Sequence, residues 1–196
     1  NKYLEIYNPT CATISLEGYA YPSTSNAPDV PGEYEFWNAF DEGASISPGG
    51  VYIIAHPSAD ESILALADET HQYLSNGDDG YALVKGTEES YVIVDWIGNW
   101  DADPGSGWDV AGEATATKDH TLVRKATVTT GNTNWTNSAG TSAEDSEWIV
   151  YDQNTWDYLG SHDYSDIRTL LFSEYAEGSS NNKYLEIYNP TCATIS

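Results

Sequence analysis

The chain has 196 residues, and its 31 Asp and Glu against 7 Lys and Arg give a formal net charge of −24. Binding to nucleic acid needs a basic face that replaces counterions on phosphate, so this charge argues against a nucleic-acid partner. An acidic surface that is poor in lysine suits salty water, divalent cations or basic partners, and we expect the protein outside the cell or at its surface.

Short segments that alternate apolar and polar residues and end in turn residues recur along the chain, which is typical of β-strands. In chain order, strands are expected at residues 3–7, 13–21, 34–37, 51–55, 81–85, 91–97, 120–125 and 148–150. One helix is predicted at residues 60–68, because its apolar residues share one face. Its N-cap is expected to be Ser58 or Asp60.

This pattern predicts an all-β protein, a β-sandwich or a barrel, with one short helix. No second hydrophobic core is indicated, so we expect one domain followed by a tail. Residues 1–162 are expected to form the body of the sandwich and residues 163–170 a connector. Residues 171–196 are expected to form a strand, a turn and a second strand.

The same fifteen residues, NKYLEIYNPTCATIS, occur at residues 1–15 and again at residues 182–196. The spacing is 181 positions (182 minus 1), and a self-match at a fixed spacing indicates a repeat. The chain is therefore one period of a tandem array, or a terminal segment was duplicated. The second copy either opens the next repeat or donates a strand to a neighbouring copy. The residues expected to form this inter-repeat strand are Leu171, Phe172, Tyr184, Leu185, Ile187 and Tyr188.

Several motif-like stretches follow one another over nearly the whole period. They are LLFSEYAEGSSNNKYLEIYNPT, LEGYAY, SISPGGVYIIAH, YALVKG, VDWIG, DPGSGWDVAG, TKDHTLVRKATVTTGNTNW and SEWIVYDQNTWDYLGSH. In this order they resemble the lamin-tail domain, in the bacterial form found in secreted and surface proteins. The resemblance implies an immunoglobulin-like β-sandwich that is not catalytic. It also implies that a domain begins with the strand at residues 171–175.

The sequence does not indicate a catalytic site. The four His residues form neither an HExxH motif nor a cluster with Cys at metal-binding spacing. Paired carboxylates such as Asp101/Asp103 and Glu144/Asp145 could serve acid–base chemistry, but solvated loop charges are the favoured interpretation. We therefore expect a protein that is not an enzyme and that requires no cofactor.

Calcium is the metal that the sequence allows, because hard cations take carboxylate and carbonyl oxygens from loops. Two turns, NGDDG and DADPGSGWD, cluster aspartates without the spacing of an EF-hand. Ordinary hydrogen bonding within Asx-turns is the alternative. The candidate ligands are Asp78, Asp79, Asp101, Asp103 and Asp109.

Two positions suggest covalent chemistry. Asn134 begins an Asn-Trp-Thr acceptor for N-glycosylation. Cys11 and Cys192 occupy the same position of the repeat, so one period holds a single Cys and forms no disulfide of its own. The thiol is then either free or a cross-link between neighbouring chains.

Tryptophans supply the remaining candidates for a binding surface. Trp100, Trp135 and Trp156 lie in stretches expected to be loops, where they present flat faces to sugars or to a neighbouring subunit, or pack at the rim of the core.

Together these features predict a structural, non-catalytic repeat unit of an extracellular fibre, filament or surface protein that assembles head-to-tail with copies of itself. The alternative is a binding or targeting module, for glycans or surface adhesion, in a secreted nuclease or adhesin. No apolar run approaches the roughly 18 residues of a membrane span. The chain contains no Met, so we expect it to be part of a longer protein.

Overall fold

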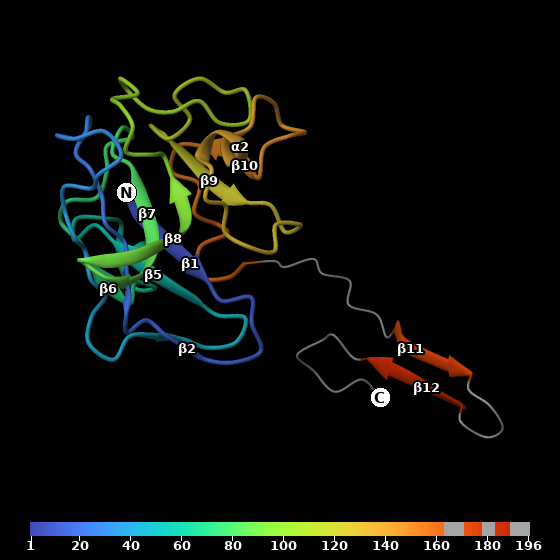
Figure 1. The fold of residues 1–196 in the computed structure, drawn as a ribbon. Coiled ribbons are helices and arrows are strands. Elements are labelled where there is room, and N and C mark those ends of the chain that lie inside the picture. The colour runs from blue at the N-terminus through green and yellow to red at the C-terminus, as the bar shows by residue number, and fades with distance from the viewer. Residues whose placement is uncertain (163–170, 178–182, 189–196) are drawn as a thin grey trace. The chain divides into compact units, whose positions relative to one another are not determined.

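The computed structural model describes residues 1–162, 171–177 and 183–188, the last two segments as strands only. The chain divides into two compact units, Asn1–Tyr164 and Ser165–Ser196, which are described separately. Figure 1 shows short strands joined by long loops in the first unit. The protein is all-β, as predicted, although the strands form several small sheets.

The first unit contains ten strands and two helices among its described residues. In chain order they are β1 (Tyr3–Tyr7), β2 (Ile14–Ser15), β3 (Tyr19–Ala20), β4 (Ser45–Ile46), β5 (Val51–Ala55), α1 (Glu61–Leu64), β6 (Glu69–Thr70), β7 (Tyr81–Thr87), β8 (Ser90–Ile97), β9 (His120–Arg124), α2 (Trp135–Ala139) and β10 (Trp148–Asp152).

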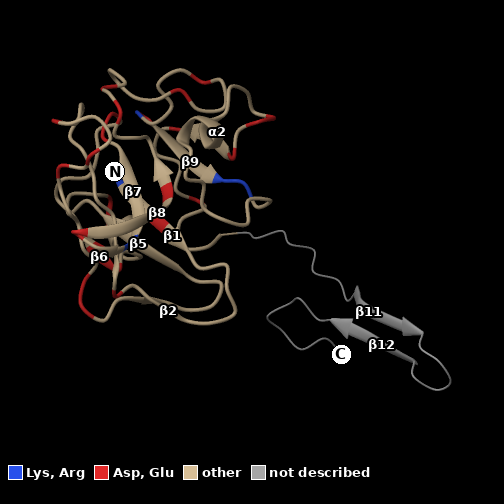
Figure 2. Ribbon diagram, viewed as in Figure 1, with Lys and Arg blue, Asp and Glu red and all other residues tan. Residues whose placement is uncertain are grey.

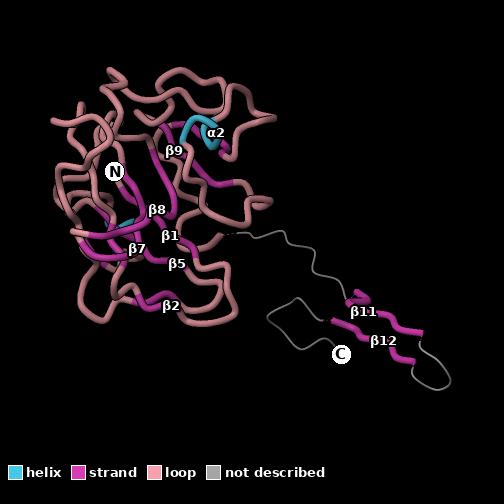
Figure 3. The backbone as a smooth tube through the Cα atoms, in the orientation of Figure 1, coloured by secondary structure: helices cyan, strands magenta, loops and turns pink. Residues whose placement is uncertain are grey.

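These strands form four small sheets. Two are three-stranded, in the orders β1-β5-β6 and β3-β7-β8, and two are pairs, β2 with β4 and β9 with β10. Every pairing is antiparallel except that of β5 with β6. Loops and turns account for much of the chain between the strands (Figure 3).

Apolar side chains gather in four clusters under these sheets. The first cluster lies where β1 meets β5: Leu4 and Ile6 pack against buried residues that include Tyr52 and Ile54. Within this cluster Glu69 is 8% exposed and accepts hydrogen bonds of 2.7 Å from the hydroxyls of Tyr21 and Tyr52. The carboxylate thus satisfies two buried hydroxyls that would otherwise be costly to bury.

The predicted strands at residues 3–7 and 51–55 are confirmed with the same bounds, and those at 81–85, 91–97, 120–125 and 148–150 are confirmed within a few residues. The expected strand at 13–21 is wrong, because a turn divides it into β2 and β3. The Tyr19 N–H donates to the Leu16 carbonyl across this turn, and Gly18 has a φ of 74° that suits glycine. Residues 34–37 form only an isolated bridge, between Ser23 and Phe36.

The expectation of one short helix is also wrong. The predicted helix is a single turn, α1, and its N-cap is Asp60, whose side chain accepts a hydrogen bond from the Ser62 N–H. The second helix, α2, was missed because five residues are too few to show a helical period. Its N-cap is Asn134, whose side chain accepts a hydrogen bond from the Asn137 N–H.

The described part of the second unit is a pair of antiparallel strands, β11 (Leu171–Glu177) and β12 (Lys183–Tyr188). The register places Leu171 opposite Tyr188 and Glu177 opposite Lys183, with an irregularity between Phe172 and Glu174. The predicted strand–turn–strand order of this segment is therefore confirmed for its two strands.

Acidic residues occur along much of the described chain of the first unit, and basic ones are few (Figure 2). Among its helices, none is long and apolar enough to cross a membrane within the described residues.

Candidate functional site

A cleft of about 360 Å³ opens between the end of β8, the loop that follows it and the start of α2. This volume is within the range of small-molecule sites. Its lining residues are Gly32, Ile93, Trp96, Asn99, Trp100, Asp101, Thr133, Asn134, Trp135 and Thr136. The lining contains neither Lys nor Arg, so the cleft suits a neutral, polar ligand better than an anion.

The cleft combines an aromatic base with a polar mouth. Trp100 is 2% exposed, its ring meets that of Trp96 edge-on at 4.6 Å between centroids, and its Nε1–H donates to the Gly80 carbonyl at 3.1 Å. These contacts hold the base rigid. Asp101 and Asn134 are exposed at the mouth and present carboxylate and amide groups to solvent.

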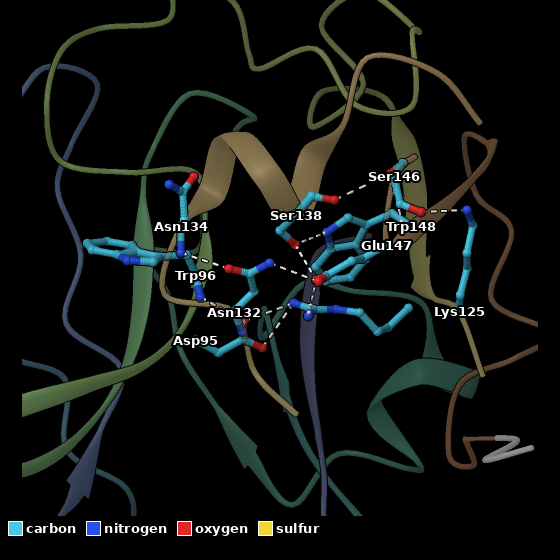
Figure 4. Close-up of polar contacts among 10 residues, drawn as sticks. Asp95, Trp96, Lys125, Asn132, Asn134, Ser138, Ser146, Glu147 and Trp148 are labelled. Atoms are coloured by element: carbon cyan, nitrogen blue, oxygen red, sulfur yellow. Dashed lines mark hydrogen bonds and ion pairs between the residues drawn. The ribbon is translucent and has the colours of Figure 1, made fainter. Parts of the chain in front are cut away.

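A partly buried ionic network holds the wall of the cleft against β8 (Figure 4). Arg124 on β9 binds the Asp95 carboxylate on β8 through Nη2 at 2.9 and 3.0 Å, and the Glu147 carboxylate through Nη1 at 2.9 Å. The Arg124 side chain is 14% exposed. Burial raises the pKa of Asp95, and the Arg124 charge opposes this rise.

Asn132 connects the network to the cleft. Its backbone N–H donates to Asp95 Oδ1 at 2.9 Å, and its Nδ2 donates to Glu147 Oε1 at 2.8 Å. Its own Oδ1 accepts from the Asn134 N–H at 2.9 Å. The ionic network thereby fixes Asn134, which caps the N-terminus of α2 and lines the cleft.

Trp148 closes the network on the other side. Its Nε1–H donates to Ser138 Oγ at 2.9 Å, and Ser138 Oγ donates to Glu147 Oε2 at 2.8 Å. The Arg124 guanidinium lies 4.1 Å from the centre of the Trp148 ring, a cation–π contact. Lys125 binds the carbonyls of Ala143 and Ser146, which ties down the loop after α2.

The network explains structure rather than catalysis. Both carboxylates are engaged by Arg124 and by neutral donors, so neither is placed as a free acid or base. Sequence reasoning missed these residues. The signal available was a charge inside an apolar strand, Asp95 in VIVDWI and Arg124 in HTLVR.

A second candidate surface is the outer edge of β1. Within the described residues β1 is an edge strand, because its sheet runs β1-β5-β6. The second copy of its sequence forms β12, which pairs with β11. The predicted inter-repeat strand residues Leu171, Phe172, Tyr184, Leu185, Ile187 and Tyr188 therefore lie in these two strands, while their side chains fall outside the described part of the structure.

The five predicted calcium ligands do not come together. No group of three His, Cys, Asp or Glu residues that could hold a metal forms within the described part of the chain. Asp79 accepts from the Asn26 N–H, Asp103 from the Gly105 N–H, and Asp109 from the Thr115 N–H. Asp78 is buried with an Oδ1 that lacks a hydrogen-bond partner, and Asp101 lies in the cleft. Calcium binding stays a prediction.

The loop tryptophans are not exposed flat faces. Trp100 and Trp135 are 2% and 4% exposed, so that interpretation is wrong for both. Trp156 is partly buried against the cluster around Ile63, as expected for packing at the rim. Trp135 lies in α2, and each of the three rings belongs to a hydrophobic cluster.

The predicted covalent sites lie in different surroundings. Asn134 is exposed, as a glycosylation acceptor must be, and glycan attachment there stays a prediction. Cys11 is disulfide-bonded, so the interpretation as a free thiol is wrong for it. Cys192 lies outside the described residues, and a cross-link between chains stays a prediction.

Comparison of the chain with known protein families, with curated proteins and with solved structures found no match. The resemblance to the lamin-tail domain stays a prediction, and the function is argued below from the strands and the cleft.

Proposed function

We propose that this chain is a non-catalytic structural repeat unit of an extracellular fibre, filament or surface protein, with the immunoglobulin-like sandwich that its resemblance to the lamin-tail domain implies. One observation carries the proposal. The same five residues, YLEIY, are strand in both units but pair with different strands, β5 in the first unit and β11 in the second. A sequence that recurs letter for letter and forms a strand both times is typical of a repeat.

The second copy needs apolar surroundings as the first does. In the first copy Leu4 and Ile6 pack against the cluster that contains Tyr52 and Ile54. Burying such a side chain contributes about 1.5–3 kcal/mol. A two-stranded hairpin alone is marginally stable in water, so its apolar residues gain most when another body covers them. Head-to-tail association supplies that cover.

Negative-stain electron microscopy of the purified chain at rising concentration tests this proposal. We expect end-to-end strings with a regular spacing, because a head-to-tail contact that does not close gives an open filament. The gene that encodes the chain is expected to continue the period of 181 residues on at least one side. Single particles at every concentration, together with unrelated flanking sequence, would contradict the proposal.

The cleft favours a second candidate function, a module that binds a neutral glycan. The partly buried ring of Trp96, together with the amide, hydroxyl and carboxylate groups of the lining, matches the apolar face and hydroxyls of a sugar. Calorimetric titration with neutral oligosaccharides tests it. Asp101→Ala is expected to weaken binding, and Asp103→Ala, an exposed neighbour that does not line the cleft, is the matched control. Equal affinity in both variants would reject the cleft as the binding site.

A further inference from the structure

We propose that KYLEIY is the inner strand of a four-stranded sheet, in the order β11–KYLEIY–β5–β6, and that copies of the chain complete this sheet by exchanging hairpins. In the exchange, β12 of one copy replaces β1 beside β5 of a second copy and brings β11 with it. The inference rests on the proposed function, since it specifies the junction through which the units assemble.

The backbone of β1 uses one edge for β5. The Lys2 carbonyl accepts from the His56 N–H at 2.9 Å, and the Asn8 N–H donates to the Gly50 carbonyl at 3.0 Å. Backbone groups of alternate residues point to opposite sides of a strand. Even-numbered residues such as Leu4 therefore bond β5, while the backbone groups of Tyr3 and Glu5 point to the outer edge.

The second copy shows which strand this sequence takes as a partner other than β5. Leu185 lies opposite Tyr175 of β11, whereas its counterpart Leu4 lies opposite Ile54 of β5. The proposal places β11 along the edge that β1 does not use for β5, so that one strand has a neighbour on each side. Neither unit contains both neighbours among its described residues, and the exchange brings them together.

The duplicated stretch contains everything that the first fifteen residues contribute to the body. Asn1 bonds Asn154 and the Asp60 N–H, each at 2.9 Å. Asn8, which is 1% exposed, donates to the carbonyls of Ile46 and Ser47. Because residues 182–196 repeat residues 1–15 letter for letter, the incoming hairpin can restore each of these contacts.

The exchange therefore restores these hydrogen bonds in the body, and it adds a ladder with β11 on the other edge of the strand. Domain swapping of this kind is a low-cost route to association, because the exchanged element makes the same contacts in either body. The occupant of the slot beside β5 is then a second copy of this chain.

The two copies of the repeat allow a matched test by sedimentation velocity of the full chain, from dilute solution to about 1 mM, the effective concentration of a tethered segment. Leu4→Pro removes an N–H that faces β5 and weakens the local strand. It should open the slot and lower the concentration of half-assembly by at least about tenfold. Leu185→Pro makes the same change in the incoming strand and should raise that concentration by at least as much.

Ile6→Ala and Ile187→Ala form a milder pair, for use if Leu4→Pro loses the tryptophan fluorescence of the folded body. They are expected to shift assembly in the same opposite directions. Equal shifts in both members of each pair would overturn the exchange while leaving assembly itself intact. If neither the wild type nor the first-copy variants associate at any concentration, the proposed function fails as well.

Discussion

Arg124 is the residue on which the loop region between β8 and β10 depends. It bridges two carboxylates, Asp95 and Glu147, and covers the Trp148 ring. A buried charge that loses its partner is costly, even where the intact pair adds little net stability. The guanidinium therefore matters chiefly because its removal would leave two carboxylates unpaired.

We predict that Arg124→Met lowers the free energy of unfolding by about 1–3 kcal/mol, because both carboxylates are partly exposed and keep neutral donors. Arg124→Lys should recover only part of this, since an ammonium cannot make the bidentate contact with Asp95. Urea denaturation measures the change. Lys118→Ala, which removes a positive charge from an exposed position, controls for net charge and should cost little. Equal losses for Lys118→Ala and Arg124→Met would reject the network as the cause.

Glu69 is a buried carboxylate that is satisfied by hydroxyls rather than by a cation. Burial and the Glu69 charge raise the pKa values of Tyr21 and Tyr52 well above the ordinary value. A hydrogen bond to a charged group contributes about 1.5–3 kcal/mol, so Tyr52→Phe should lower the free energy of unfolding by about that amount. Tyr73→Phe, at a residue 77% exposed, is the control. A chemical denaturation midpoint unchanged by Tyr52→Phe would contradict this account.

Asp145 is an exposed residue that nevertheless organises a turn. The Ser142 N–H, the Thr141 hydroxyl and the Thr141 N–H lower the pKa of its carboxyl from 3.8 to about 2. A group whose folded pKa is depressed stabilises the fold above its unfolded pKa, and this contribution disappears as pH falls through the folded value.

The stability difference between wild type and Asp145→Ala should therefore be full above pH 4 and should vanish between about pH 4 and pH 2. Thermal unfolding of the two proteins across this range measures the difference. The contributions of the other carboxylates are the same in both proteins and cancel. Carboxyl chemical shifts give the pKa directly. A midpoint near the ordinary aspartate value would show that the turn does not hold the carboxylate.

At the scale of elements, the loop before α2 lies directly on β8. A Cβ at Gly131 would come within 2.4 Å of the Val94 carbonyl oxygen and 2.9 Å of the Asp95 Cβ. Only a residue without a side chain allows this approach, and the approach lets the Asn132 N–H reach Asp95.

Gly131→Ala should push this loop off β8 and lower the free energy of unfolding by about 1–3 kcal/mol, the usual cost of overpacking. The matched control is Gly105→Ala. Gly105 also lies in a loop, and a Cβ there meets nothing within 4 Å, although its φ of 85° adds strain. Amide exchange of Asn132 should rise in Gly131→Ala alone. Unchanged protection of that amide would disprove the close approach.

The sequence predicted the longer strands well and the short elements poorly. β1 alternates over five residues, β5 is a continuous apolar run, and both end at turns, so their bounds could be read from the sequence. β4, β6 and α2 hold two to five residues each and depend on distant partners, which no local pattern reports. The cleft was missed for the same reason, because its lining comes from β8, three loops and α2. The repeat, in contrast, could be found from the letters alone.

For the whole molecule, the net charge of −24 opposes any contact between copies. Raising the ionic strength shortens the Debye length from about 30 Å at 0.01 M to about 8 Å at 0.15 M. Self-association is therefore expected to strengthen with salt over this range, as measured by light scattering. Association that weakens as salt rises would instead indicate attraction between opposite charges at the junction.

The letter-for-letter identity of the two fifteen-residue segments has a kinetic meaning as well. In the proposed exchange two identical strands compete for one slot beside β5, where they make the same contacts, so proximity and the added β11 ladder decide which one occupies it. A tethered segment has an effective concentration in the millimolar range, which a free neighbour cannot match in dilute solution. The proposed exchange would then not occur in dilute solution. It would begin where chains are crowded or held side by side, so that the local concentration of chains controls assembly.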